Sequence, residues 1–330
     1  VRTAKEVGKA CMKEKVETQA QIAAREAKAH KREIWKKAHK RAEKQIRRVK
    51  RSSRLFIAPS FLGVLVFFVV PFGVVIYYSM VDNPISGNFV FLDNFARLLR
   101  NKSFQIAVRN TLGFSLLSVP LAVILSSVLA IVLESKIPFK SQFRTFFLSP
   151  MMVPVASIVL IWQVLFHYNG AVNDVLVALG GSKIDWFKSS YALVVVAILF
   201  LWKNLGYNMI LFMSALSSIP KDVLEVAELE SATPLQTFFY IKIRYLSSTF
   251  LFVTIMSLIS SFKVFREVYL LTGDHPTDTV YLLQHLMNNA FASLDYQRLS
   301  AAAILMSLFM IVLIGILFLV EDRFGKDVEG

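Results

Sequence analysis

Cysteine is almost absent from this chain, which has one, Cys11, among 330 residues. One cysteine excludes a disulfide-stapled secreted protein, and no cysteine and histidine residues cluster at the spacing of a zinc site. Charged residues are also scarce, at 18% compared with about 25% in typical soluble domains. The sequence contains no Gly-x-x-x-x-Gly-Lys-Ser/Thr phosphate loop, so the chain does not hold ATP by that motif. We therefore expect no metal and no cofactor.

Hydrophobic residues, by contrast, make up 55% of the chain and gather in long runs. Six of these runs reach the roughly 20 residues that an α-helix needs to cross a bilayer. This pattern predicts an all-α polytopic membrane protein with six transmembrane helices. The expected spans are Leu55–Met80, Phe104–Leu133, Thr145–His167, Tyr191–Ile219, Ser248–Leu271 and Leu299–Val320.

The net charge of +14 is concentrated in residues 1–54, which hold 19 lysine and arginine residues against 6 acids. This segment has no proline and a single glycine, so where it is ordered we expect a helical arm. We interpret it as a basic cytoplasmic extension that fixes topology, with contact to anionic membrane lipid as the alternative. No aromatic pattern or motif supports nucleic-acid binding.

The distribution of lysine and arginine orients the spans. With the basic arm inside, the cytoplasmic connections hold 27 of these residues and the outer connections hold 6. The positive-inside rule therefore predicts that both the N- and C-termini are cytoplasmic. Most of the difference comes from the arm, because without it the count is 8 against 6.

Polar residues interrupt the fourth and fifth spans, although a charge within a span costs about 2.5–3.5 kcal/mol on insertion scales. In the fourth span, Gly206 predicts close helix packing beside groups able to hydrogen-bond a solute. In the fifth, Lys263 and Glu267 are four residues apart and share a helix face. Two interpretations stay open: a solute pathway with aromatic rings for stacking on sugars, or an ion pair that docks neighbouring helices. The pathway candidates are Asn204, Tyr207, Asn208, Phe262, Lys263, Phe265, Arg266, Glu267 and Tyr269.

The connection between the fourth and fifth spans, residues 219–247, contains a short amphipathic segment. Val223, Val226 and Ala227 fall on one side, and acidic residues occupy the rest. About three helical turns are too few to cross a bilayer, and such a helix is suited to a groove on a partner protein. The alternative is a helix lying on the lipid headgroups, which its four acids disfavour because the inner leaflet is negative. A following helix is predicted at Thr233, where Thr-Pro-Leu-Gln fits a capping box.

The same connection resembles the loop of permease subunits of binding-protein-dependent ABC importers, in the oligosaccharide branch that includes maltose-type importers. Glu225-Val226-Ala227 resembles the family's Glu-Ala-Ala, Glu230-Ser231-Ala232 stands where Asp-Gly-Ala is usual, and Ile241-Lys242-Ile243-Arg244 replaces Ile-x-Leu-Pro. The differences at Ser231 and Arg244 leave the bend after the short helix open. Further matching segments over residues 55–322 include Phe91-Leu92-Asp93-Asn94-Phe95, Arg109-Asn110-Thr111, Gly170-Ala171-Val172-Asn173, Ser261-Phe262-Lys263-Val264-Phe265 and Leu271-Thr272-Gly273-Asp274-His275-Pro276.

The resemblance implies the type I ABC importer permease fold, over residues 55–330, preceded by the basic arm. It implies a sugar permease in a prokaryotic inner membrane that works by alternating access. The implied partners are a pair of cytoplasmic ATP-binding subunits, a second permease and an extracytoplasmic solute-binding protein. A coupling helix over Glu225 to Ala232 would dock on the ATPase. The implied coupling residues are Asp222, Val223, Glu225, Val226, Ala227, Glu228, Glu230, Ser231 and Ala232.

Three other functions were weighed against this one. A secondary transporter driven by H⁺ or Na⁺ would ordinarily need intramembrane acids, and Glu267 is the only acid expected within a span. An intramembrane enzyme is disfavoured because the chain lacks His-Glu-x-x-His and Gly-x-Ser-x-Gly. The lone histidines His167, His275 and His285 are expected to be polar surface residues rather than ligands. A member of the same family for another solute, such as an amino acid or phosphate, stays open.

Overall fold

The structure is a computed structural model that describes residues 35–36, 39–40, 43, 56–134, 138–274 and 276–325. Its contacts divide the chain into two units, Val1–Gly73 and Val74–Gly330. The five described residues of the basic arm are helical, and the rest of the arm lies outside the described residues. The predicted division at residue 54 therefore stays a prediction.

The first expected span is a helix of 24 residues, Phe56–Ser79. It contains a π-helical turn, η1 (Leu65–Val69), directly followed by α2 (Val70–Ser79). The wider turn comes just before Pro71, which has no N–H to donate to the preceding turn. The length and apolar composition confirm the prediction for this segment.

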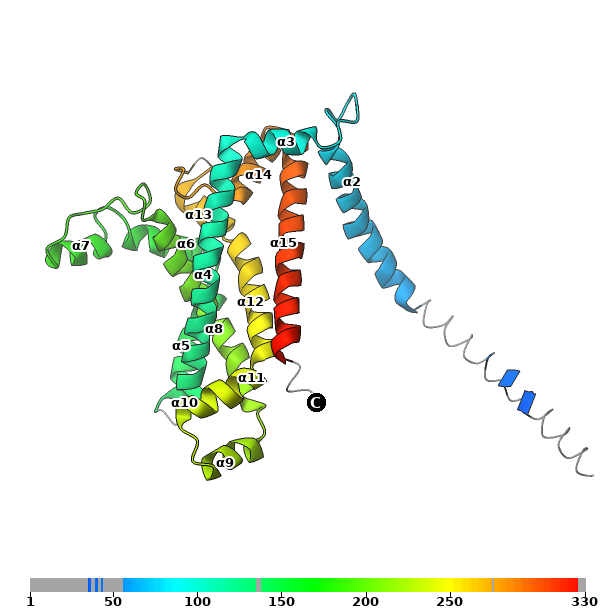
Figure 1. Ribbon diagram of the computed structural model, residues 1–330. Coiled ribbons are helices and arrows are strands. Elements are labelled where there is room, and N and C mark those ends of the chain that lie inside the picture. The colour runs from blue at the N-terminus through cyan, green and yellow to red at the C-terminus, as the bar shows by residue number, and fades with distance from the viewer. Residues whose placement is uncertain are drawn as a thin grey trace, which may run out of the picture. The chain divides into compact units, whose positions relative to one another are not determined.

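In the second unit, five helices run side by side: α4 (Lys102–Glu134), α5 (Lys140–Met152), α8 (Ala192–Ser217), α12 (Ser247–Phe262) and α15 (Tyr296–Gly325) (Figure 1). At one end of this bundle lie α3 (Asp93–Arg100) and α14 (Leu283–Ala292), and at the other end lies α9 (Lys221–Leu229). We call these the α3 end and the α9 end. Apart from one isolated bridge between Val81 and Phe89, the described residues form helices, turns and loops.

The expected third span, Thr145–His167, is wrong as a single straight helix. The chain forms α5 and then α6 (Val155–Leu165), which are bent by 101° relative to each other. The bend falls at Val153, whose backbone is extended, followed by Pro154. A residue before proline is driven out of the helical region, and proline donates no hydrogen bond to the preceding turn. After the bend, α6 packs against α13 (Phe265–Thr272) and leads to α7 (Ala171–Ala178).

The fifth span is also interrupted. Its 26 residues, Ser247–Thr272, divide into α12 and α13, with Lys263 and Val264 in a turn between them. The other predicted spans correspond to α4, α8 and α15, with ends that shift by a few residues. The loop from α9 to α12 contains α10 (Pro234–Gln236), η2 (Thr237–Lys242) and α11 (Ile243–Tyr245).

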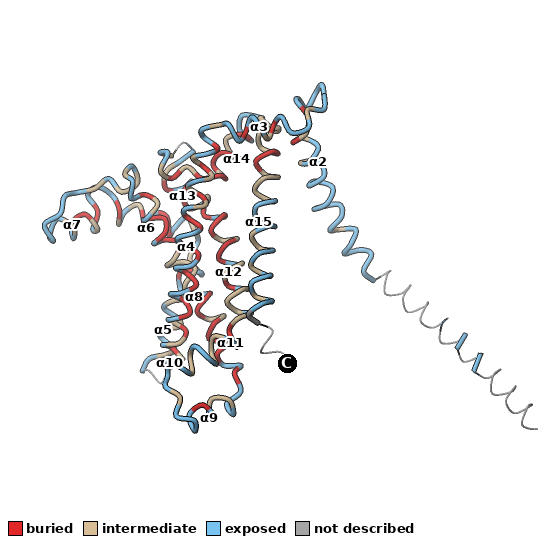
Figure 2. The backbone as a smooth tube through the Cα atoms, viewed as in Figure 1, coloured by how far each residue is buried: buried red, intermediate tan, exposed pale blue. Residues whose placement is uncertain are grey.

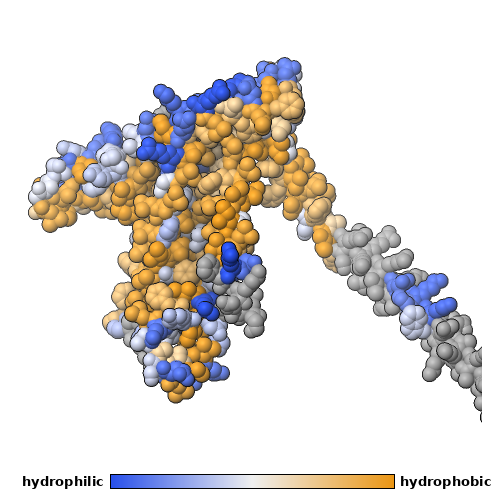
Figure 3. Space-filling view, viewed as in Figure 1, coloured by the Kyte–Doolittle hydropathy of each residue, from blue (hydrophilic) through white to orange (hydrophobic). Residues whose placement is uncertain are grey.

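Tight packing of α8 against its neighbours forms the centre of the bundle, where the buried residues concentrate in Figure 2. Phe212 of α8 and Val253 of α12 are fully buried in one apolar cluster with residues of α4. A Cβ atom on Gly206 would lie 1.9 Å from the carbonyl oxygen of Phe147 on α5, which confirms that this glycine permits close packing. Apolar side chains also cover the sides of the bundle in Figure 3, as a lipid-facing surface requires.

Candidate functional site

A cavity of about 970 Å³ lies where α8 meets α12 and α13. It is lined by polar, charged and aromatic side chains within two apolar spans. Six of the nine predicted pathway residues line it: Asn204, Lys263, Phe265, Arg266, Glu267 and Tyr269. The remaining lining residues are Leu199, Phe200, Lys203, Ser260, Val264, Leu270 and Gln284.

The partner of Glu267 is Lys203 of α8, not Lys263 as the helical spacing predicted. The side chain of Glu267 is 8% exposed and that of Lys203 is 31% exposed. Because α12 ends just before Lys263, Lys263 and Glu267 do not occupy successive turns of one continuous helix. Lys203 was not among the residues predicted for the pathway. The sequence did contain a signal for Lys203. A lysine in the middle of a membrane span has a high free-energy cost, so it needs an acidic partner.

Three predicted pathway residues do not line this cavity. Asn208 is buried and donates a hydrogen bond of 2.9 Å to the hydroxyl of Ser257, which joins α8 to α12. Phe262 is buried in an apolar cluster, with its ring 6.3 Å from that of Phe309 on α15. The side chain of Tyr207 is exposed away from the cavity lining. All three fall on other faces of their helices because the cavity meets only one side of α8 and α12.

Aromatic rings form one part of the cavity wall. The rings of Phe265 and Tyr269 lie 5.4 Å apart, one helical turn from each other on α13. Behind Phe265 lies His285, whose ring centroid is 4.7 Å away in an edge-to-face arrangement. The expectation that His285 is a surface residue is wrong, because it is fully buried. Its Nδ1 accepts a hydrogen bond of 3.2 Å from the N–H of Leu282, and burial lowers its pKa to about 4.

His167 is exposed, as expected, and His275 lies outside the described residues. Among the residues that the structure describes, no three histidine, cysteine, aspartate or glutamate side chains come together as a metal site.

The second candidate site is the short helix α9 at the α9 end. It runs from Lys221 to Leu229, with Pro220 directly before it and Asp222 in its first turn. The implied coupling segment, Glu225 to Ala232, therefore extends three residues beyond the end of the helix. Glu230 caps it, and Ser231 has a left-handed backbone with φ of 58°. The N–H of Ser231 bonds to the carbonyl of Glu228, and that of Ala232 bonds to Ala227, each at 3.0 Å. This is a Schellman ending, so Ser231 forms the bend that a glycine usually provides.

The two faces of α9 differ. Ala227 is buried, and Leu224 packs against the apolar cluster of α8 and α12. On the other side, Val226 is 56% exposed and Leu229 is 84% exposed. The acids of the helix are exposed as well: Asp222, Glu225 and Glu228. The helix therefore holds to its own chain by one face and presents an apolar and acidic face outward.

Two polar contacts fix the segment that follows α9. The predicted capping box is confirmed: the Thr233 N–H donates to Oε1 of Gln236 at 2.8 Å, and the Gln236 N–H donates to Oγ1 of Thr233 at 3.3 Å. Lys242 of η2 forms an ion pair of 2.8 Å with Glu134 at the end of α4. The sequence analysis did not single out this pair, whose members are 108 residues apart.

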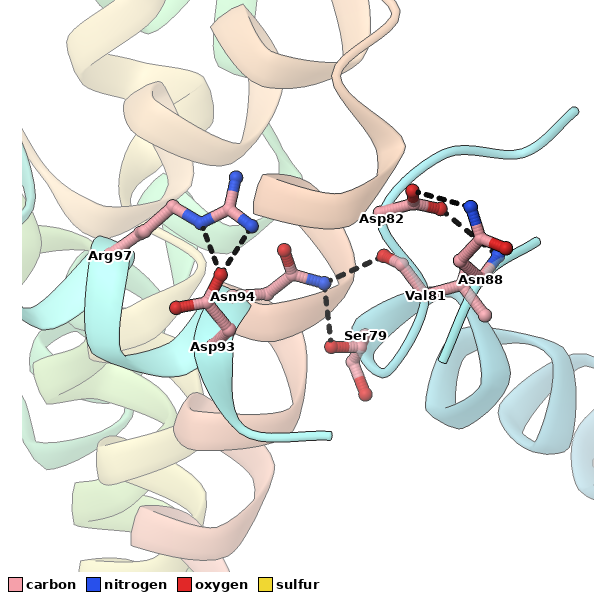
Figure 4. Close-up of polar contacts among 7 residues, drawn as sticks. All are labelled: Ser79, Val81, Asp82, Asn88, Asp93, Asn94 and Arg97. Atoms are coloured by element: carbon pink, nitrogen blue, oxygen red, sulfur yellow. Dashed lines mark hydrogen bonds and ion pairs between the residues drawn. The ribbon is translucent and has the colours of Figure 1, made fainter. Parts of the chain in front are cut away.

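At the α3 end, asparagines of the matching segments fasten loops. Figure 4 shows the side-chain amide of Asn94 donating to the carbonyls of Ser79 at 3.0 Å and Val81 at 2.8 Å. Asn110 of α4 donates in the same way to Asp278 and Tyr281, in the segment before α14. Asn173, which is fully buried, bonds to both the N–H and the carbonyl of Ile184. These three residues have structural roles that their positions in the sequence did not reveal.

Comparison with known protein families identifies the family of the chain that contains these two sites. The profile of the family described as binding-protein-dependent transport system inner membrane component matches residues 118–330. The chain belongs to this family. It is a multi-pass inner-membrane permease component, as the sequence resemblance predicted.

Several curated relatives are permeases of this family. The chain is 28% identical over 275 residues to the sn-glycerol-3-phosphate transport system permease protein UgpA of Yersinia pestis, covering 82% of this chain and 93% of the relative. It is 29% identical over 249 residues to the lactose transport system permease protein LacF of Rhizobium radiobacter, covering 72% and 82%. It is 28% identical over 261 residues to the sulfoquinovosyl glycerol transport system permease protein SmoG of Agrobacterium fabrum, covering 76% and 84%.

Solved structures share the permease's fold. A chain of a bacterial ABC transporter involved in the import of the acidic polysaccharide alginate superimposes with a TM-score of 0.73 at 19% identity, covering 83% of this chain and 97% of that chain. A chain of the alginate transporter in complex with alginate pentasaccharide-bound periplasmic protein gives 0.74 at 19% identity, covering 84% and 97%. The six-helix type I importer permease fold is confirmed, with its third span broken at Pro154.

Proposed function

We propose that this permease carries a carbohydrate across the membrane and forms one half of an alternating-access pathway. The observation that carries the proposal is the polar and aromatic cavity between α8 and α13, inside spans that are otherwise apolar. Hydrogen-bonding groups such as Asn204 and ring faces such as Phe265 are the two features that sugar recognition uses. The cargoes named for the relatives are sn-glycerol-3-phosphate, lactose and sulfoquinovosyl glycerol, a phosphorylated polyol and two sugar compounds, which supports a carbohydrate over an amino acid.

The energy for transport is proposed to come from a pair of separate ATP-binding subunits. The sequence itself has no phosphate loop for ATP. The outward face of α9, with Val226 and Leu229 between exposed acids, is suited to a groove with an apolar floor and a basic rim. All nine predicted coupling residues lie on α9 or in the three residues that follow it. Val223 and Glu225 remain proposed members of this contact, whereas Ala227 is buried on the inner face of α9.

A second permease and an extracytoplasmic solute-binding protein complete the proposed assembly. One permease chain supplies only one wall of a pathway, and the proposed partner supplies the other. The excess of lysine and arginine in the connections at the α9 end supports a cytoplasmic location for that end and for both termini. The solute-binding protein would then deliver solute at the α3 end.

The proposed mechanism couples the two sites through rigid packing. Closure of the ATP-binding subunits moves α9, which is held to the α8–α12 cluster by Leu224. The bundle then rocks against the second permease and exposes the cavity first to one side and then to the other.

Substitution of Glu225 by lysine tests the coupling step. Glu225→Lys places a cation against a groove adapted to an acidic helix, so we expect it to abolish uptake and to prevent co-purification of the ATP-binding subunit. Asp174→Lys is the matched control, because Asp174 is an exposed acid in the first turn of the short helix α7. Membrane insertion, measured by fractionation, should be normal in both variants. Normal uptake and co-purification in Glu225→Lys would contradict the coupling proposal.

The energy source separates this function from an ion-coupled transporter. In proteoliposomes that contain the whole transporter, uptake should require ATP inside and should persist when ionophores remove H⁺ and Na⁺ gradients. Uptake that follows an ion gradient without ATP would contradict the proposal.

A further inference from the structure

The charged side chains that line the cavity are mostly cations. Among the lining residues that the structure describes, Lys203, Lys263 and Arg266 face one acid, Glu267. The carboxylate of Asp274 lies next to the hydroxyl of Tyr269 at the edge of the same cavity, and counting it still leaves three cations against two acids. We propose that the solute is an anionic carbohydrate, whose negative group is bound by Lys263 and Arg266. This inference rests on the proposed function of the cavity as part of the solute pathway.

The single lining acid is already engaged. Glu267 is paired with Lys203, and its side chain is almost completely buried by that contact and by the packing of α13. It therefore neutralises Lys203 and is not available to the other two cations. Lys263 and Arg266 are both exposed, and the side chain of neither makes a hydrogen bond or ion pair to any residue that the structure describes.

The break between α12 and α13 explains why the two cations face the same space. Lys263 occupies the turn directly after α12, and Arg266 lies in the first turn of α13. The positive end of the α13 dipole lies at the same position and adds to the attraction for a negative group. Both residues belong to the span Ser247–Thr272, where charged side chains are rare and are usually paired or face a cavity.

An anionic group on the solute would compensate both charges. The guanidinium of Arg266 is able to bind a carboxylate, sulfonate or phosphate through two parallel hydrogen bonds, and the ammonium of Lys263 adds a third donor. The rings of Phe265 and Tyr269 flank Arg266 on α13 and offer faces for the sugar ring. A negative group and a sugar ring therefore find complementary partners on one short helix.

The first test uses the purified solute-binding protein of this transporter in a thermal-shift screen. The probes are pairs that differ in charge: oligogalacturonates and their methyl esters, glucose 6-phosphate and glucose, and glucose 6-sulfonate and glucose. A preference for the charged member of any pair supports the inference, and identifies carboxylate, phosphate or sulfonate as the group. A preference for neutral sugars overturns the inference and leaves the proposed carbohydrate function intact. A protein that binds amino acids and no sugar of either kind overturns both.

The second test determines whether Lys263 and Arg266 bind the negative group of the solute. In proteoliposomes with the complete transporter, Lys263→Gln combined with Arg266→Gln should lower uptake of the bound anionic probe by roughly tenfold or more, since hydrogen bonds to charged groups contribute about 1.5–3 kcal/mol. The charge-conserving pair Lys263→Arg and Arg266→Lys should retain most of the uptake. Lys188→Gln removes an exposed cation that does not line the cavity and should leave uptake unchanged. Unchanged uptake in the double glutamine variant would overturn the inference.

Discussion

Lys203 of α8 and Glu267 of α13 form an ion pair between two membrane-spanning segments that are 64 residues apart in the sequence. The pair lies in the wall of the cavity and ties together the two helices that form it. Loss of one member would leave the other as an uncompensated charge in a span. The geometry of the candidate solute site therefore depends on this pair as well as on the residues that face the solute.

Glu267→Gln is expected to destabilise the protein by about 1.5–3 kcal/mol, because the Lys203 ammonium loses its charged acceptor. Thermal unfolding of the purified protein in detergent measures this loss. The double variant Lys203→Gln with Glu267→Gln removes both charges and should be more stable than Glu267→Gln alone. A double variant that is less stable than Glu267→Gln would show that Lys203 and Glu267 do not stabilise the protein as an ion pair.

Gly206→Ala is expected to destabilise the protein by about 1–3 kcal/mol, the usual cost of overpacking. The added Cβ would lie 1.9 Å from the carbonyl oxygen of Phe147, so α5 and α8 must separate. Gly113→Ala on α4 is the matched control, because its Cβ would meet nothing within 4 Å. Thermal unfolding in detergent should show a loss for Gly206→Ala and no loss for Gly113→Ala. Equal stability of the two variants would show that the close approach is not a constraint.

Asn173→Asp is expected to loosen the segment between α7 and α8. The amide nitrogen of Asn173 donates to the carbonyls of Tyr168 and Ile184, and a carboxylate oxygen there would face both carbonyls without a proton to share. Limited proteolysis should cut this segment faster in Asn173→Asp than in the wild type. Asn169→Asp, in the loop before α7, should behave as wild type, because it keeps the oxygen that accepts from Lys183. Equal cleavage of the two variants would contradict the fastening role.

The buried His285 predicts a loss of stability at acidic pH. Burial lowers the pKa of its imidazole from 6.5 to about 4 in the folded chain. As pH falls from 6.5 toward 4, the unfolded chain binds a proton that the folded chain does not, so unfolding becomes more favourable. His285→Gln does not titrate, so its unfolding temperature should fall less than that of the wild type over this range. Parallel curves for the two proteins would contradict the prediction.

Much of the fold can be predicted from the sequence, because the composition of a segment by itself determines whether that segment spans the membrane. A run of about 20 apolar residues must be helical in lipid, whatever it packs against, since its backbone groups have no water to bond. Five of the six expected spans correspond to long helices for this reason. The break of the third span was also encoded locally, at Val153 and Pro154, but hydropathy averages over such a position and does not register it.

The candidate sites were only partly readable. Helical periodicity put Lys263 on the same face as Glu267, and the turn between α12 and α13 removed that relationship. Asn208 and Phe262 were sensible candidates by residue type, yet the direction in which each side chain points depends on the rotation of its helix within the bundle. Ser231 departs from the usual glycine, and the Schellman hydrogen bonds show that serine still makes the bend.

The sequence by itself determined the class of protein, the number of apolar segments and the presence of an acidic helix outside them, because composition and short-range pattern suffice for each. Tertiary structure alone decided the partner of Glu267, the ion pair between Glu134 and Lys242, and the loops that Asn94, Asn110 and Asn173 fasten. These contacts join residues whose neighbours are set by how the helices pack, and no local pattern carries that information.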